Sequence, residues 1–183
     1  MARTLVTGGV RSGKSRYAET LLSPTAPVTY LSPGYPADPT HDPEWAERVV
    51  AHRTRRAPAW RTVETLALTD GIRGAEGPVL VDCLGTWVTR LLDSWDAWDQ
   101  PHAPWLPRFE AEVEALAAAV SGKAGDLVIV TNEVGWGLVS EYRSGRIFVD
   151  LLGRTNAKVA AACDTVVLMV AGRPLVLPAE PET

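Results

Sequence analysis

The chain contains 183 residues, of which 46% are hydrophobic and 22% are charged, and it carries a formal net charge of −4 at pH 7. These values are typical of a soluble globular protein, and the lack of a long basic block disfavours a nucleic-acid partner. The first residues lack the apolar stretch of a signal peptide, and no segment approaches the roughly 20 apolar residues that a membrane span needs. We therefore expect a cytoplasmic protein with no membrane span and no nucleic-acid partner.

Short apolar runs alternate with longer amphipathic stretches, which is the pattern of strands buried on both faces and joined by helices. Six strands are predicted, over residues 3–7, 28–32, 79–83, 127–131, 165–170 and 175–177. Five helices are predicted, over residues 14–22, 43–53, 86–98, 106–120 and 147–162. The sequence thus predicts the α/β fold class, with a mostly parallel sheet and helices on both faces. We expect one nucleotide-binding domain over residues 1–177 and a disordered, Pro/Glu-rich tail at 178–183.

A glycine-rich turn links the first predicted strand to the first predicted helix, and its pattern is G-x4-G-K-S, that of a P-loop. In such a turn the backbone N–H groups and the helix N-terminus face phosphate oxygens. Lys14 then reaches the terminal phosphates, and the Ser15 hydroxyl ligates Mg²⁺. A nucleoside triphosphate is therefore the predicted occupant. The predicted contacts are Gly8, Gly9, Val10, Arg11, Ser12, Gly13, Lys14 and Ser15.

A cluster of basic residues lies at and just beyond the end of the predicted helix 43–53, whose start is marked by Asp42 and Pro43. An imidazole among guanidinium groups suits attack on a phosphorus whose charge those groups neutralise. The alternative is a solvated helix end, where the helix dipole favours cations. The other two histidines lack such neighbours and are not expected to be catalytic. The cluster consists of His52, Arg53, Arg55 and Arg56, and the other histidines are His41 and His102.

Polar side chains follow two of the predicted strands, at the carboxyl edge where open α/β sheets bind ligands. Asp82 follows an apolar run and is the expected second ligand of Mg²⁺ beside Ser15. The alternative is that Asp82 caps the next helix. Asn132 and Glu133 follow another strand, and for them ligand binding and turn formation are both open.

The ordered set of motifs resembles the bifunctional adenosylcobinamide kinase / adenosylcobinamide-phosphate guanylyltransferase family of cobalamin biosynthesis. The resemblance covers nearly the whole chain except residues 93–107 and the tail. Five stretches carry it: GGVRSGKS (8–15), HRTRRAPAWRTVE (52–64), VLVDC (79–83), VTNEVGWGLV (130–139) and GRTNAKVAAACDTVVLMVAG (153–172).

This resemblance implies a RecA-like P-loop NTPase fold, commonly a homo-oligomer and specifically a trimer. It implies that adenosylcobinamide is phosphorylated with ATP or GTP, and that GMP from GTP is then transferred to adenosylcobinamide phosphate. The GMP would pass through a guanylyl-histidine, with His52 as the catalytic residue, and the product would be adenosylcobinamide-GDP. Besides residues 8–15, the implied nucleotide contacts are Ser32, Pro33, Gly34, Arg53, Thr54, Arg55, Arg56, Glu64 and Asp82.

Two alternatives stay open from the residues alone. One is an ordinary P-loop kinase of another small molecule, for which His52 has no role. The other is a non-catalytic nucleotide-binding protein whose arginines dock a partner. For Trp87 and Trp136 core packing is the expected role, and a platform for the corrinoid is the alternative.

Overall fold

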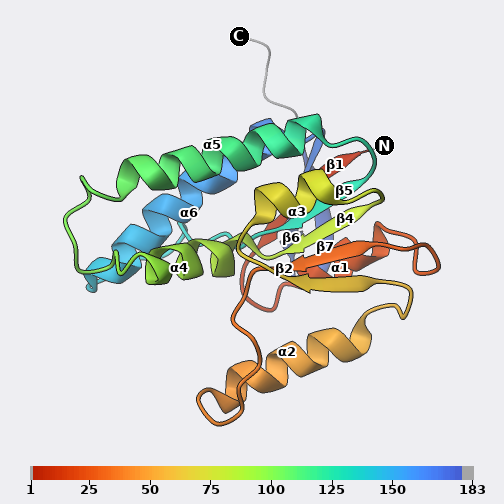
Figure 1. Cartoon of the computed structure of the whole chain (residues 1–183), viewed down its shortest axis with the longest axis horizontal. Helices are drawn as coiled ribbons and strands as arrows, with labels where there is room; N and C mark the ends of the chain where they lie inside the picture. The colour runs from red at the N-terminus through yellow and green to blue at the C-terminus, as the bar shows by residue number, and fades with distance from the viewer. Residues whose placement is uncertain (1, 179–183) are drawn as a thin grey trace.

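Seven strands form one sheet in the order β3-β2-β4-β5-β1-β6-β7, and all neighbours are parallel except β6 and β7 (Figure 1). This computed structural model describes residues 2–178, so the predicted tail lies outside the described residues apart from residue 178. The strands are β1 (Arg3–Gly8), β2 (Thr29–Ser32), β3 (Arg61–Glu64), β4 (Val79–Asp82), β5 (Leu127–Val130), β6 (Thr165–Val170) and β7 (Arg173–Leu177). The helices are α1 (Lys14–Thr20), α2 (Pro43–Arg55), α3 (Leu68–Gly74), α4 (Leu84–Ser94), α5 (Leu106–Gly122) and α6 (Arg143–Ala161).

Alternate side chains of the central strands enter two separate cores, because successive residues of a strand point to opposite faces. On β4, Val79 and Val81 pack with α3, α4, α5 and α6, whereas Leu80 packs with α1 on the other face. All three side chains have no exposed surface. The predicted α/β class, with a mostly parallel sheet and helices on both faces, is confirmed.

Helix α2 stands apart from both cores, on the side of the sheet opposite α3–α6 (Figure 1). Ala46 is its one buried residue. Its start follows the prediction, because Asp42 caps it by accepting a hydrogen bond from the Trp45 amide at 2.9 Å and Pro43 opens it. The helix is therefore fixed to the molecule mainly by contacts of its polar side chains, which are described below.

Two elements were not predicted, and all five predicted helices have bounds that differ from the prediction, with the largest differences in α4 and α6. Strand β3 has charged and exposed residues instead of an apolar run, and α3 contains Gly71, a poor helix former. Helix α6 begins at Arg143 instead of residue 147, because its polar first turn carries no apolar periodicity. Helix α4 runs over Leu84–Ser94 instead of 86–98. Within residues 2–178, no helix is both long and apolar enough to cross a membrane.

Candidate active site

The P-loop forms the turn between β1 and α1, as predicted. Gly13 adopts φ 91° at the start of α1, a left-handed conformation that glycine takes at little cost. Lys14 is buried, with 8% of the residue exposed, and its ammonium donates to the Gly9 carbonyl at 3.1 Å. Burial lowers the pKa of Lys14, and the nearby Cys83 and Asp82 oppose that shift. The Lys14 side chain therefore lies over the P-loop, and its ammonium is placed beside the loop where phosphate oxygens would bind.

Asp82 is the centre of a polar cluster at the carboxyl end of β4. Its Oδ2 accepts a hydrogen bond from the Tyr30 hydroxyl at 2.7 Å and lies 3.6 Å from His52 Nδ1. The Ser15 side chain of the P-loop also lies close to this carboxylate and acts to lower its pKa. Helix α4 is capped by Cys83 without a side-chain bond, so Asp82 is not its cap. Three segments that are distant in sequence therefore meet at one carboxylate.

The protonation states in this cluster follow from its contacts. Burial acts to raise the pKa of Asp82, but the contacts from His52, Tyr30 and Ser15 lower it by more, so the carboxyl is ionised at neutral pH. Burial and the Asp82 charge raise the pKa of Tyr30 well above its usual value. At neutral pH the Tyr30 hydroxyl therefore keeps its proton and donates it in a hydrogen bond to the ionised Asp82 carboxylate.

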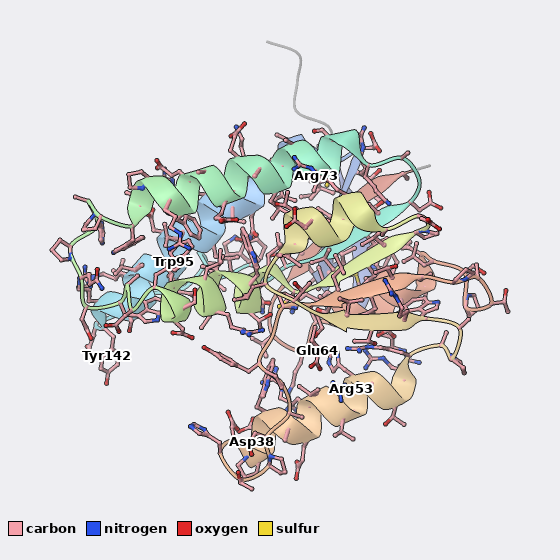
Figure 2. The ribbon with its side chains drawn as sticks, viewed as in Figure 1. Asp38, Arg53, Glu64, Arg73, Trp95 and Tyr142 are labelled. Atoms are coloured by element: carbon pink, nitrogen blue, oxygen red, sulfur yellow. The ribbon has the colours of Figure 1, made fainter. Side chains whose placement is uncertain are left out.

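The arginines after His52 make contacts that the sequence did not predict. Arg53 pairs with Glu64 at the end of β3, and Figure 2 shows the two side chains pointing toward each other. Arg55 donates two hydrogen bonds of 2.8 Å to Glu19 of α1. In this conformation the guanidinium groups hold α2 against the rest of the molecule.

Arg56 and Thr54 are also engaged within the chain. The Arg56 guanidinium lies 3.6 Å from the centre of the Tyr30 ring and donates to Thr62 Oγ1 at 2.8 Å. The Thr54 hydroxyl donates to the Val50 carbonyl at 3.0 Å, inside its own helix. Arg56 therefore belongs to the Asp82 cluster through the tyrosine, whereas Thr54 is turned to its own backbone.

Ser32, Pro33 and Gly34 follow β2 at the same edge of the sheet. Ser32 is paired in register with Glu64, so these two predicted contacts lie side by side. The Pro33 and Gly34 carbonyls each accept a hydrogen bond of 2.9 Å from Arg90 of α4. These carbonyls are thus occupied by the chain itself.

The oxygen donors expected for Mg²⁺ are brought together. The Ser15 hydroxyl and the Asp82 carboxylate lie close to each other, and both are hard oxygen ligands of the kind that Mg²⁺ prefers. Residues 2–178 contain no group of three His, Cys, Asp or Glu side chains arranged for a metal. Such a group is not needed, because Mg²⁺ in nucleotide sites is held by one or two side chains together with phosphates. These residues fit the ion.

The segment after β5 combines fixed and exposed residues. The Glu133 amide donates to the Gly8 carbonyl at 3.1 Å, which places this segment beside the P-loop. Farther along, Trp136 is 76% exposed and Leu138 is fully exposed, so the prediction of core packing was wrong for Trp136. For Trp87, which is 1% exposed, it is confirmed.

Tyr30 and Glu19 belong to the site but were not predicted from the sequence. Tyr30 looked like an ordinary residue of a buried strand, and its bond to Asp82 spans 52 positions. Glu19 lies in the predicted helix 14–22, and nothing in its local sequence marks it as a partner of Arg55. The sequence gives one indication of such residues: several arginines follow His52, and arginines that are held in a fold need acidic or aromatic partners elsewhere in the chain.

Comparison with known proteins gives a match of residues 4–177 to the family model for cobinamide kinase / cobinamide phosphate guanyltransferase. The chain is 40% identical over 178 residues to the bifunctional adenosylcobalamin biosynthesis protein CobU of Escherichia coli, covering 92% of this chain and 95% of that protein. It is 37% identical over 184 residues to the bifunctional adenosylcobalamin biosynthesis protein CobP of Pseudomonas aeruginosa, covering 98% and 99%. A solved structure of an ATPase from a bacterial type III secretion system is 13% identical, with a TM-score of 0.48, covering 91% of this chain and 50% of the other.

Proposed function

Because the chain belongs to the cobinamide kinase / cobinamide phosphate guanyltransferase family, we propose that it phosphorylates adenosylcobinamide and then guanylylates the product. ATP or GTP serves the first step, and GTP supplies GMP in the second, which yields adenosylcobinamide-GDP. One observation carries the proposal: His52 Nδ1 lies 3.6 Å from Asp82 Oδ2, and this carboxylate lies close to Ser15 of the P-loop. A simple kinase needs no imidazole beside its phosphate-binding loop.

The first step relies on the P-loop. The loop backbone and Lys14 bind the phosphates, and the ammonium opposes the charge that develops during transfer of the terminal phosphoryl group. Ser15 and Asp82 would hold Mg²⁺, which when bound neutralises phosphate charge. Lys14 is partly desolvated, so water screens its charge less than that of a surface lysine, and a phosphate oxygen would take the place of the Gly9 carbonyl as its acceptor.

The second step uses His52 as the nucleophile. Asp82 faces Nδ1, so a proton on Nδ1 is stabilised there and the lone pair is left on Nε2. A bond forms between Nε2 and the α-phosphorus of GTP, the bond from that phosphorus to the bridging oxygen breaks, and pyrophosphate leaves. An oxygen of the acceptor phosphate then bonds to the same phosphorus, and the bond to Nε2 breaks. Asp82 acts throughout as the group that orients the imidazole.

The predicted residues have unequal support in this scheme. The cluster of Tyr30, Asp82 and Ser15 supports His52 directly. Arg53, Arg55 and Arg56 would have to exchange their present partners for phosphate oxygens, whereas Thr54, Pro33 and Gly34 face other parts of the chain. The trimeric state, the cytoplasmic location and the single domain over residues 1–177 stay predictions.

Analysis of the corrinoid products distinguishes the proposed bifunctional enzyme from a kinase that only phosphorylates its substrate and transfers no GMP. Adenosylcobinamide, ATP and GTP are incubated with the wild type, with His52→Asn and with His41→Asn as the control, and the corrinoids are separated by chromatography. We expect the wild type and His41→Asn to form the GDP derivative, and His52→Asn to stop at the phosphate. An undiminished yield of the GDP derivative from His52→Asn would refute the role of His52.

A further inference from the structure

The backbone at Asn132 and Glu133 is held from two sides. The Glu133 amide donates to the Gly8 carbonyl at 3.1 Å, which ties it to the first residue of the P-loop. The Asn132 carbonyl accepts from Asn156 Nδ2 at 2.9 Å, and Asn156 Oδ1 accepts from the buried Thr131 hydroxyl at 2.6 Å. Hydrogen bonds from α6 and from the P-loop thus fix the backbone position from which the Glu133 side chain extends.

The Glu133 carboxylate itself is free of cations. The other acids around the site are engaged: Asp82 by Tyr30, His52 and Ser15, Glu64 by Arg53, and Glu19 by Arg55. Glu133 makes no ion pair anywhere in the described part of the chain. Its Oε2 has one weak neighbour, the Thr7 hydroxyl at 3.4 Å.

An acceptor hydroxyl must lose its proton when its oxygen bonds to phosphorus, and a carboxylate within hydrogen-bond reach takes that proton efficiently. Asp82 is committed to three partners. We propose that Glu133 is the base of the kinase step, a proposal that rests on the proposed function above. The acceptor oxygen bonds to the terminal phosphorus, the bond from that phosphorus to the β–γ bridging oxygen breaks, and the nucleoside diphosphate leaves. The hydroxyl proton passes to a carboxylate oxygen of Glu133 and later to water.

The surroundings of Glu133 suit a bulky acceptor. The side chain is partly exposed, and the chain beyond it is open: nothing lies within 4 Å of a Cβ built at Gly135 or Gly137. Leu138 is fully exposed. An acceptor alcohol can therefore approach from the side of the segment after β5, while the nucleotide phosphates occupy the P-loop.

The guanylyl transfer gives an internal comparison for this proposal. A phosphate monoester is already largely ionised at pH 7, because its second pKa is about 6. Its attack on a guanylyl-histidine therefore needs no base. Glu133→Gln, which keeps the shape but cannot accept the proton, should slow the kinase step alone.

The experiment measures both steps separately in Glu133→Gln, in Glu133→Ala and in Glu141→Gln, an exposed acid of the same segment that serves as the control. Phosphorylation is followed with γ-labelled ATP and adenosylcobinamide. Guanylyl transfer is followed with α-labelled GTP and adenosylcobinamide phosphate that the wild type has prepared. We expect Glu133→Gln to lose about 10²–10⁴-fold in the phosphorylation rate and to keep the wild-type guanylylation rate. Formate should restore part of the phosphorylation by Glu133→Ala.

Three outcomes would count against the account, and they can be told apart. Wild-type phosphorylation by Glu133→Gln would overturn the role of Glu133. An equal loss of both steps, in a protein with unchanged thermal unfolding and no rescue by formate, would also overturn it and would mean that Glu133 only shapes the turn. A wild type that does not phosphorylate adenosylcobinamide would instead refute the proposed function.

Discussion

Tyr30→Phe removes one hydrogen bond from the centre of the site and little else. The Tyr30 side chain is 1% exposed, and its hydroxyl donates to Asp82 Oδ2 at 2.7 Å. Phenylalanine keeps the ring on which Arg56 lies. The substitution therefore tests whether Asp82 is held as an ionised carboxylate by its neighbours.

The expected size of the effect follows from the charge of the acceptor. A hydrogen bond to a charged group contributes about 1.5–3 kcal/mol to stability, so we expect a loss of that order in the free energy of unfolding at pH 7. For a chain of this length such a loss corresponds to a fall in Tm of roughly 3–12 °C. Tyr17→Phe is the matched control, since Tyr17 packs against the same core and its hydroxyl makes no hydrogen bond within residues 2–178.

Urea unfolding of the wild type and both variants at several pH values gives the test. The pKa of Asp82 is lowered in the folded protein, so its stabilising contribution is complete above the ordinary carboxyl pKa of about 3.9 and is lost as the pH falls through the folded value. The difference between the wild type and Tyr30→Phe should therefore be largest at neutral pH and should shrink in acid. A difference below about 0.5 kcal/mol at pH 7, which is within the usual effect of a neutral substitution, would refute this reasoning.

Two further predictions concern the first strand. A Cβ at Gly8 would lie 2.7 Å from the Met169 carbonyl oxygen, whereas nothing lies within 4 Å of one at Gly9. Gly8→Ala should therefore lower the free energy of unfolding by about 1–3 kcal/mol through overpacking, and Gly9→Ala should lower it much less. Thermal unfolding without nucleotide measures both, and equal melting temperatures of the two variants would contradict the close packing at Gly8. Hydrogen bonds from Arg3 lower the pKa of Asp164 to about 2. The pairing therefore stabilises the folded state fully above the ordinary carboxyl pKa of about 3.9, and this contribution is lost as the pH falls from there to about 2. NMR titration of the side-chain carboxyls should show a pKa of about 2 for Asp164 in the wild type, and the Asp164 signal should be absent in Asp164→Asn. A pKa near the ordinary carboxyl value would exclude the pairing of Asp164 with Arg3.

The parts of the fold that the sequence predicted are those set by short-range patterns. The buried strands are continuous apolar runs, and the P-loop has a fixed spacing of glycines and a lysine. Strand β3 was missed because it lies at the edge of the sheet, where β2 is its only partner among residues 2–178, and its mostly exposed residues Arg61–Glu64 carry no apolar pattern. Its position depends on pairing with β2, not on its own composition.

The site was predictable to the extent that each residue carries its own chemistry. Lys14, Asp82 and His52 could be proposed one at a time, but the contact of His52 with Asp82 depends on how α2 lies beside the sheet. That placement is set by ion pairs such as Arg55 with Glu19, which are 36 positions apart. No local pattern identifies such pairs, because many arginines and acids of the surface are equally compatible in charge.

The central claim is that His52 carries GMP covalently. The most direct measurement incubates the pure protein with Mg²⁺ and GTP labelled at the α-phosphate, denatures it, and tests the chain for an acid-labile, base-stable label, with His52→Asn and His41→Asn alongside. The account predicts label on the wild type and on His41→Asn and none on His52→Asn. A chain that binds GTP but acquires no label, or a His52→Asn variant labelled like the wild type, would contradict it.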